Sequence, residues 1–300
     1  MDAILLEPYK VFLVYRVATD SFTKVKNFTY KAQVLIFDQE TMSVTYGTAV
    51  SLGTYYYYTL TELLYKVPGT TNQVWFSYST GASQYTPKSC YLKITGTTIT
   101  TIATYVYYNT TYATHAVMPV STTKALYLYN TGEADDSYYC VLTFSENSAT
   151  VTAGTTTSLS SSRSYDPCPA LIFGGKYVCL GYGTGSYHYA QMFTIDGTTA
   201  TGTSIKASEA RNTTYYYLGE DDTYTYCLQR YRSGSTSAYG HNIQQYVTST
   251  GVRTDGTVIS DSARAIWRPI SVNEHIFAGD DQFSRQGLTL TYVGETNLNL

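Results

Sequence analysis

The sequence predicts an all-β fold, a six-bladed β-propeller built from four-stranded antiparallel blades. Three observations predict it. Tyrosine supplies 34 of the 300 residues, against a background of Thr, Ser and Gly, and Tyr and Thr favour strands because their side chains fit a pleated, half-buried surface. Strand-like tracts recur about every 50 residues, and turns rich in Gly, Asp, Asn, Ser and Thr separate them.

The first series of tracts ends, each time, in an apolar residue followed by a polar turn. The last residues of successive tracts are 57, 50, 51, 52 and 46 positions apart. We expect them to occupy equivalent positions and to face the packed interior between sheets. They are Phe37, Ile94, Phe144, Ile195, Val247 and Val293.

A second series lies 16 to 24 residues upstream of the first, with spacings of 63, 51, 52, 48 and 50. A further short apolar tract and a tight turn precede each of its members. Each unit therefore reads as four short strands joined by hairpins. The centres of the second series are Leu13, Phe76, Tyr127, Cys179, Cys227 and Phe277.

These units predict one domain over residues 1–300. Four-stranded sheets repeated at this interval are typical of a β-propeller. A β-sandwich array is the alternative, with a β-solenoid behind it, but two sandwiches would not keep one period across the midpoint and a solenoid coil is usually shorter. The last unit leaves only residues 297–300 for its outer strand, so how the ring closes stays open. The approximate blades are 1–60, 61–112, 113–166, 167–208, 209–263 and 264–300.

Charge and composition exclude several classes of protein. The 19 basic and 22 acidic residues give a net charge of -3, which argues against a nucleic-acid partner. No segment approaches the ~20 apolar residues that a membrane-spanning helix needs, so no membrane insertion is expected. The five cysteines show no CxxC spacing, so neither a disulfide framework nor a zinc site is indicated.

Catalytic motifs are missing from the sequence. It contains no HExxH, GxSxG or GxxxxGK[ST] pattern, and its four histidines occur singly. The sequence therefore predicts no enzyme, no catalytic or cofactor-binding residues and no cofactor, apart from a calcium ion if the acidic loops bind one.

The acidic loops are the candidate metal site. Clusters of carboxylates follow a Gly that ends a strand, and Ca²⁺ takes six to eight oxygen ligands. A third acidic run, at 220–222, follows a first strand rather than a second and should emerge on the opposite face. Solvated hairpin loops are the alternative interpretation. The candidates are Glu133, Asp135, Asp136, Asp280 and Asp281.

Tyrosines at strand ends are the candidate binding residues, because an exposed Tyr offers an apolar plane with a polar tip. Packing between blades is the alternative, since alternation sends every second ring inward. The candidates are Tyr55, Tyr57, Tyr107 and Tyr216.

The turn-and-strand pattern resembles the β-propeller proteins of bacteriophage virions, especially tail-associated and fibre-like proteins. An apolar strand, a Gly-Thr-Thr turn and a Thr-rich strand occur at 93–100 and 193–203, and 43–48 and 150–155 match the second half. The resemblance implies a virion location after assembly in a bacterial host cytoplasm.

Three hypotheses of function follow. The first is a non-enzymatic virion structural or accessory protein, tail- or capsid-associated, whose partners are other virion proteins in a large assembly. The alternative is a propeller that binds a host surface receptor or glycan during adsorption. The third is a glycoside hydrolase-like propeller enzyme, although the S-x-D-x-G-x-x-W boxes and clustered arginines of the sialidase type are missing.

Overall fold

Strands are the only regular elements in the described part of this computed structural model, which confirms the all-β antiparallel class. The chain divides into two compact units, Met1–Ser161 with Ile195–Ala200, and Ser162–Thr194 with Thr201–Leu300. No helix in the described residues has the length and hydropathy to cross a membrane. The structure describes residues 2–18, 27–56, 62–80, 86–106, 115–130, 137–160, 171–173, 177–184, 187–208, 211–221, 223–232, 239–247, 252–261, 270–272, 275–278 and 281–295.

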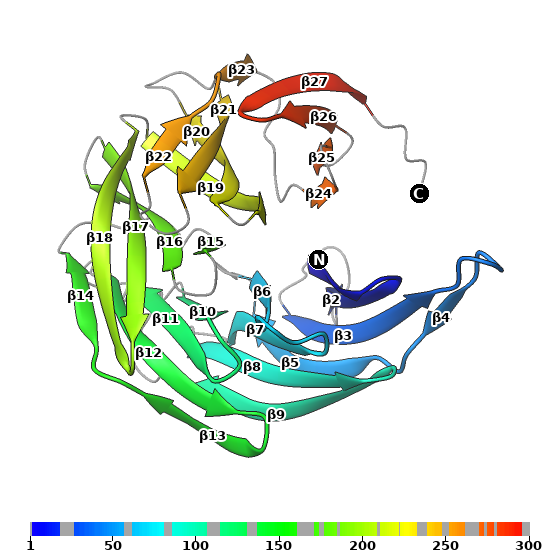
Figure 1. Cartoon of the computed structure of the whole chain (residues 1–300). Helices are drawn as coiled ribbons and strands as arrows, with labels where there is room; N and C mark the ends of the chain where they lie inside the picture. Colours follow the sequence, from blue (N-terminus) through cyan, green and yellow to red (C-terminus); the bar gives the residue numbers. More distant parts are fainter. Residues whose placement is uncertain are drawn as a thin grey trace. The chain divides into compact units, whose positions relative to one another are not determined.

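Unit 1 contains three antiparallel sheets, coloured blue through green in Figure 1. In each, consecutive strands pair as hairpins. The first sheet comprises β1 (Asp2–Glu7), β2 (Lys10–Ala18), β3 (Asn27–Phe37), β4 (Val44–Tyr46) and β5 (Val50–Tyr56). The second comprises β6 (Glu62–Lys66), β7 (Gln73–Thr80), β8 (Thr86–Thr95) and β9 (Thr98–Val106). The third comprises β10 (His115–Pro119), β11 (Lys124–Asn130), β12 (Ser137–Ser145), β13 (Ser148–Ala153) and β14 (Thr157–Ser160).

Unit 2 holds the other three sheets, with the turn of the β17–β18 hairpin counted in unit 1. The fourth sheet comprises β15 (Leu171–Phe173), β16 (Tyr177–Thr184), β17 (Tyr187–Asp196) and β18 (Thr199–Ser208). The fifth comprises β19 (Arg211–Glu220), β20 (Tyr224–Arg232), β21 (Tyr239–Val247), β22 (Arg253–Asp255) and β23 (Ile259–Asp261). The sixth comprises β24 (Ile270–Val272), β25 (His275–Ala278), β26 (Asp281–Gln286) and β27 (Thr289–Glu295).

The first, third and fifth sheets differ from the predicted four-stranded pattern because their outer strand is interrupted. In the first sheet, β4 pairs with the end of β3 and β5 pairs with its beginning. The same division separates β13 from β14 and β22 from β23. A glycine follows the first half each time, and its N–H bonds to a carbonyl of the third strand: Gly47 to Val34, Gly154 to Val141 and Gly256 to Ile243.

The interruption of the outer strand leaves room for a turn of the next sheet to pack against the glycine. A Cβ built on Gly47 would lie 2.6 Å from the Thr97 carbonyl oxygen, in the β8–β9 turn. A Cβ on Gly154 would lie 2.7 Å from the Thr198 carbonyl oxygen, in the β17–β18 turn. Only glycine allows backbone to approach so closely. The turn between the third and fourth strands of one sheet is thus seated on the preceding sheet.

The core of unit 1 lies on both faces of the second sheet. Phe76 and Tyr78 of β7 pack with Tyr30 of the first sheet, whereas Trp75 packs with Tyr91 and Phe144 on the side of the third sheet. Alternate residues of a strand point to opposite faces, so a sheet covered on both sides reads as the nearly continuous apolar run that β7 shows.

The two predicted series fare differently. All six centres of the second series lie in the second strand of their sheets. Of the first series, five lie at the end of a third strand, but Val293 lies in the fourth strand, β27. The third strand of the sixth sheet, DQFSRQ, has a single apolar residue. A search for apolar tracts therefore does not identify it as a strand.

The expected burial of the first series is also partly wrong. Ile94 and Phe144 are buried, but Phe37 is 43% exposed and Val293 is 55% exposed. Phe37 is the last residue of β3, where the six residues 38–43 precede β4. The equivalent connection after β8 has only two residues, but Phe37 keeps the register of Ile94 and Phe144, because each N–H bonds to the carbonyl oxygen of the residue before the second strand. Ile94 and Phe144 pack with the preceding sheet of unit 1, whereas no sheet of unit 1 precedes the first one.

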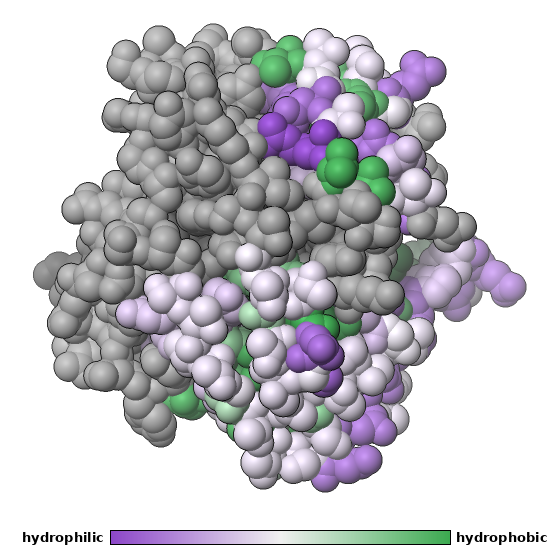
Figure 2. Space-filling model, turned by 60° about the vertical axis from the view of Figure 1, so that its left-hand side comes forward, coloured by the Kyte–Doolittle hydropathy of each residue, from purple (hydrophilic) through white to green (hydrophobic). Residues whose placement is uncertain are grey.

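The surface reflects the composition. On the face drawn in Figure 2, most described residues are white or pale, near the middle of the hydropathy scale, with smaller purple and green groups among them. Thr, Ser, Gly and Tyr all have such intermediate hydropathy.

Candidate functional site

Three polar clusters in the described residues bring together side chains of the kinds that bind ligands or transfer protons. They differ in their exposure to solvent, and only an exposed cluster can contact a ligand. Two lie in unit 1 and one lies in unit 2.

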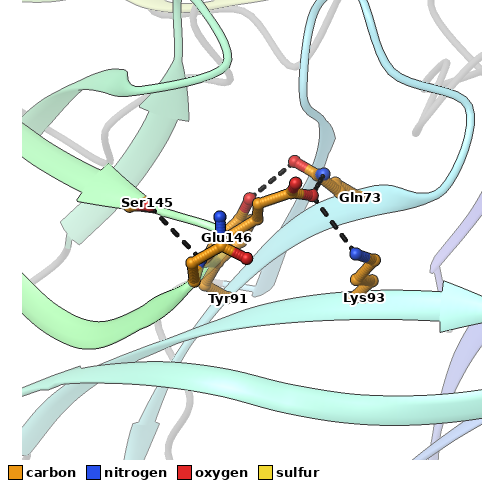
Figure 3. A network of polar contacts seen from close by, with 6 residues as sticks. Gln73, Tyr91, Lys93, Ser145 and Glu146 are labelled. Carbon is orange, nitrogen blue, oxygen red and sulfur yellow. Dashed lines mark hydrogen bonds and ion pairs between the residues drawn. The ribbon is translucent and has the colours of Figure 1, made fainter.

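The first cluster, the Glu146 network, joins the second and third sheets. Glu146, in the β12–β13 turn, accepts hydrogen bonds from Gln73 Nε2 at 2.8 Å and from Lys93 Nζ at 3.2 Å. The Tyr91 hydroxyl donates to Gln73 Oε1 at 2.5 Å. Figure 3 shows Glu146 lying between Gln73 and Lys93, with Tyr91 beneath.

Burial determines the protonation state of Tyr91 in the Glu146 network. Tyr91 has no exposed surface, and burial together with the nearby Glu146 charge raises the pKa of its hydroxyl to about 12. A phenol held protonated and inaccessible cannot exchange protons with a substrate. The network therefore holds the second and third sheets together. The close contacts of turns with Gly47 and Gly154 do the same between other sheets.

The second cluster is the buried group Ser77, Ser89 and His115. The two serine hydroxyls are 2.9 Å apart, and Ser77 Oγ accepts the N–H of Val117 at 3.1 Å. His115 Nε2 lies 3.2 Å from the Lys88 carbonyl oxygen, so Nε2 carries the proton. All three side chains are at most 1% exposed, and burial lowers the pKa of His115 to about 4. This group packs β10 against the second sheet and is closed to a ligand.

The third cluster, the Tyr226 cluster, comprises Asp221, Tyr226, Gln245 and Arg285. The Tyr226 hydroxyl donates to Asp221 Oδ2 at 3.1 Å, and Gln245 Nε2 donates to the same hydroxyl at 3.5 Å. The guanidinium carbon of Arg285 lies 4.5 Å from the centroid of the Tyr226 ring. Asp221 is exposed and the other three are half-buried, so this cluster is open to solvent.

Local structure explains how these groups come together. Asp221 Oδ1 accepts the N–H groups of Thr223 and Tyr224, which closes the β19–β20 turn and aims Oδ2 at Tyr226. Gln245 lies directly opposite Tyr226 in the β20–β21 pair. Arg285 lies in β26, the third strand of the sixth sheet.

The position of Arg285 depends on a seated turn. A Cβ built on Gly256 would collide with the Leu288 carbonyl oxygen, in the β26–β27 turn. Arg285 is three residues before Leu288 and its Nη1 reaches the Gly287 carbonyl oxygen at 3.4 Å within the same turn. The close contact between Gly256 and Leu288 therefore determines where Arg285 lies relative to the Tyr226 ring.

The charges of the Tyr226 cluster are coupled. Backbone hydrogen bonds from Thr223 and Tyr224 are the main cause that lowers the pKa of Asp221, and Arg285 adds to it. Desolvation, followed by the hydrogen bond to Asp221, raises the pKa of Tyr226. At neutral pH the cluster therefore presents a carboxylate, a neutral phenol and a guanidinium.

Most of the predicted site residues fall outside the described residues: Glu133, Asp135, Asp136, Asp280, Tyr57 and Tyr107. Asp281 begins β26 opposite Ala278. Tyr55 pairs with Phe28 in β5, and Tyr216 pairs with Leu228 in β19, but their side chains lie outside the described part. Within the described residues, no group of three or more His, Cys, Asp or Glu side chains could hold a metal ion.

Sequence reasoning missed Tyr226, Gln245 and Arg285. The acidic run at 220–222 was visible, and Asp221 does follow a first strand as expected. Arg285 is 59 positions beyond Tyr226 in the chain, so no local motif connects them. An arginine in the third strand of a unit, where other units carry apolar residues, was the available signal.

Comparisons with known proteins identify the fold but no family. No family model matches the chain, and no curated protein matches it. A proposed 6-phosphogluconolactonase from Bacteroides uniformis has a solved structure similar to 95% of this chain and 81% of its own, with 14% identity and a TM-score of 0.59.

A polysaccharide lyase, the ulvan lyase of family PL25, is similar over 98% of this chain and 78% of its own. The identity is 10% and the TM-score is 0.56. The same kind of lyase bound to -[GlcA(1-4)Rha3S]- has a TM-score of 0.54, also at 10% identity.

These comparisons contradict the prediction of a non-enzymatic virion protein. The three solved structures named above are those of a proposed lactonase and of a polysaccharide lyase, not of phage structural components. The residues behind the resemblance explain the error. Gly96 and Gly197, with φ of 60° and 57°, serve tight hairpin turns, and any antiparallel sheet with such turns needs glycine there.

Proposed function

We propose that the protein is an enzyme that acts on an acidic saccharide, and that its six sheets are the blades of a six-bladed β-propeller. One observation carries the proposal. The solved structures similar to almost the full chain include a proposed sugar-lactone hydrolase and a lyase bound to a saccharide that contains glucuronate and sulfate. Both names refer to ligands with hydroxyl groups and an acidic group.

The missing motifs agree with such an enzyme. Strands in a sheet bring residues distant in the chain into contact, so a catalytic group assembled from several sheets leaves no contiguous pattern. The Tyr226 cluster illustrates the principle, because its members come from the fifth and sixth sheets.

The net charge makes a local cation necessary. A protein with a formal charge of -3 does not attract a polyanion over its whole surface, so recognition of an acidic saccharide must rest on individual basic side chains. Lys93 is paired with Glu146 and Arg253 is paired with Asp255. None of the ion pairs within the described residues involves Arg285.

Turnover by the purified protein tests the proposal. Ulvan would be followed by the ultraviolet absorbance of an unsaturated uronate, the product of β-elimination. A sugar lactone would be followed by acid release in a pH-stat. We expect one of these reactions to exceed the uncatalysed rate, with heat-denatured protein as the control. Failure of both, on several uronate polysaccharides and lactones, would refute the enzyme.

A further inference from the structure

We propose that the Tyr226 cluster binds the acidic sugar unit of the substrate, with Arg285 on the carboxylate and Asp221 on the ring hydroxyls. This assignment rests on the proposed function for the class of ligand. The geometry of the cluster supports it in three ways: the availability of Arg285, the match of donors and acceptors, and rigidity.

Arg285 is available to a ligand. Its guanidinium lies over the Tyr226 ring. Its Nε is buried and has no hydrogen-bond partner among the described residues, so the Nη groups are the ones that would meet a ligand. The hydrogen bond to Gly287 O is long, at 3.4 Å. A planar guanidinium held by an aromatic ring is preorganised to donate two parallel hydrogen bonds to an oxyanion.

The donors and acceptors of the cluster complement an acidic sugar. An ionised Asp221 can only accept hydrogen bonds, and Arg285 can only donate them. Gln245 carries both kinds of group. A ligand that satisfies all three must offer O–H donors and an anionic acceptor within a few ångströms of each other. A uronate ring has both, whereas a neutral sugar lacks the anion and an inorganic anion lacks the donors.

The cluster is also rigid. Asp221 is fixed by two backbone hydrogen bonds, at 2.8 and 2.7 Å, and Arg285 is fixed by the turn seated on Gly256. Groups that are already in place lose little entropy when they bind a ligand. Lys93 and Glu146 offer no such pair, because they contact each other at 3.2 Å.

Binding of two matched small molecules tests the assignment. Methyl glucuronide and methyl glucoside differ only in a carboxylate against a hydroxymethyl group, and calorimetry measures the affinity for each. We expect the glucuronide to bind about tenfold or more tightly, the effect of a charge-assisted hydrogen bond. Equal affinities, or no binding of the glucuronide, would overturn the proposal. So would sulfate competing as well as the glucuronide does.

Three variants locate the effect. Arg285→Gln should abolish the preference for the glucuronide. Asp221→Asn should weaken both ligands by the same factor, because an asparagine oxygen still closes the turn but is a poorer acceptor for hydroxyls. Arg253→Gln, which removes an arginine from the neighbouring strand β22, is the matched control and should leave both affinities unchanged.

The outcomes separate this inference from the proposed function. Glucuronide preference that depends on Arg285 in a protein without turnover would leave the binding site standing and remove the enzyme. Turnover by the wild-type protein, together with a glucuronide preference that is unchanged in Arg285→Gln, would support the enzyme and rule out this binding site. If Arg285→Gln does not fold, as its thermal melt would reveal, Asp221→Asn carries the test, and unchanged affinities in that variant would overturn the assignment.

Discussion

His115 is a buried titratable residue whose charge state is coupled to the stability of unit 1. It is fully buried, and its Nε2 donates to the Lys88 carbonyl oxygen. Burial lowers its pKa from 6.5 to about 4. The unfolded chain therefore binds a proton more readily than the folded protein does, and stability falls as the pH decreases below about 6.5.

Replacement of His115 by Gln should reduce this pH dependence. Each pKa unit corresponds to about 1.4 kcal/mol, so the wild-type protein should lose up to about 3 kcal/mol from this group between pH 6.5 and 4. Glutamine can still donate to Lys88 O and does not titrate. Urea unfolding at a series of pH values measures both slopes. Parallel slopes for His115→Gln and the wild type would show that His115 is not the buried titrating group.

Phe144 and Phe37 form a second contrast at the residue scale. Phe144 is 2% exposed and meets Trp75 and Tyr91 edge-on, at centroid distances of 5.3 and 4.8 Å. Truncation of Phe144 to Ala should cost about 3 to 5 kcal/mol, from lost transfer free energy and the cavity. Phe37→Ala, at a 43% exposed ring, should cost about 1 kcal/mol. Thermal or urea unfolding compares them, and equal losses would contradict the packing described.

At the scale of the element, the interrupted outer strand is the device that seats a turn of the next sheet. Gly154→Ala places a methyl group 2.7 Å from Thr198 O and 3.2 Å from Val141 O, both backbone atoms that cannot rotate away. The β17–β18 turn must shift away from the third sheet, at a cost of about 1 to 3 kcal/mol. Denaturant unfolding measures the loss.

A second glycine in the same junction supplies the control. Gly197 has φ of 57°, and no atom lies within 4 Å of the position that a Cβ would take there. Asparagine tolerates this conformation better than other residues do, so Gly197→Asn should cost about 1 kcal/mol or less. A loss in Gly197→Asn as large as in Gly154→Ala would mean that backbone conformation, not the close contact at the turn, requires the glycines.

The sequence predicts elements well where their pattern is apolar. Phe76, Tyr127 and Cys227 are buried in second strands and recur at a regular interval, so they stand out in the sequence. The third strand of the sixth sheet is polar, and nothing in its composition separates it from a loop. The interruption at Gly47 could not be predicted either, because its cause is a carbonyl 50 residues away, at Thr97.

The candidate site was less predictable than the fold, for the same reason. Asp221 belonged to a visible acidic run, but its partners Tyr226 and Arg285 are ordinary strand residues in the sequence. What distinguishes them is the contact between two sheets, which the turn at Leu288 sets. A site made by contacts between sheets requires the structure.

At the scale of the whole molecule, the fold and the function rest on different observations. Hairpin chemistry, including Gly-Thr turns, is shared by antiparallel folds of many functions, which is why it pointed to the wrong class of protein here. Similarity of architecture over 95% and 98% of the chain to two enzymes is the broader observation. It leads to the central proposal that this protein acts on acidic saccharides.

The most direct test of that proposal is the rate of product formation from a uronate polysaccharide and from the same polysaccharide after chemical reduction of its carboxyl groups. Both preparations have the same backbone linkages, so a difference in rate shows that the acidic group is needed. We predict turnover of the native polymer and no detectable product from the reduced polymer, because the reduced sugar lacks both the charge for a charge-assisted contact and the carboxyl group that acidifies the proton removed in β-elimination. Equal rates for the two polymers, or no product from either, would contradict it.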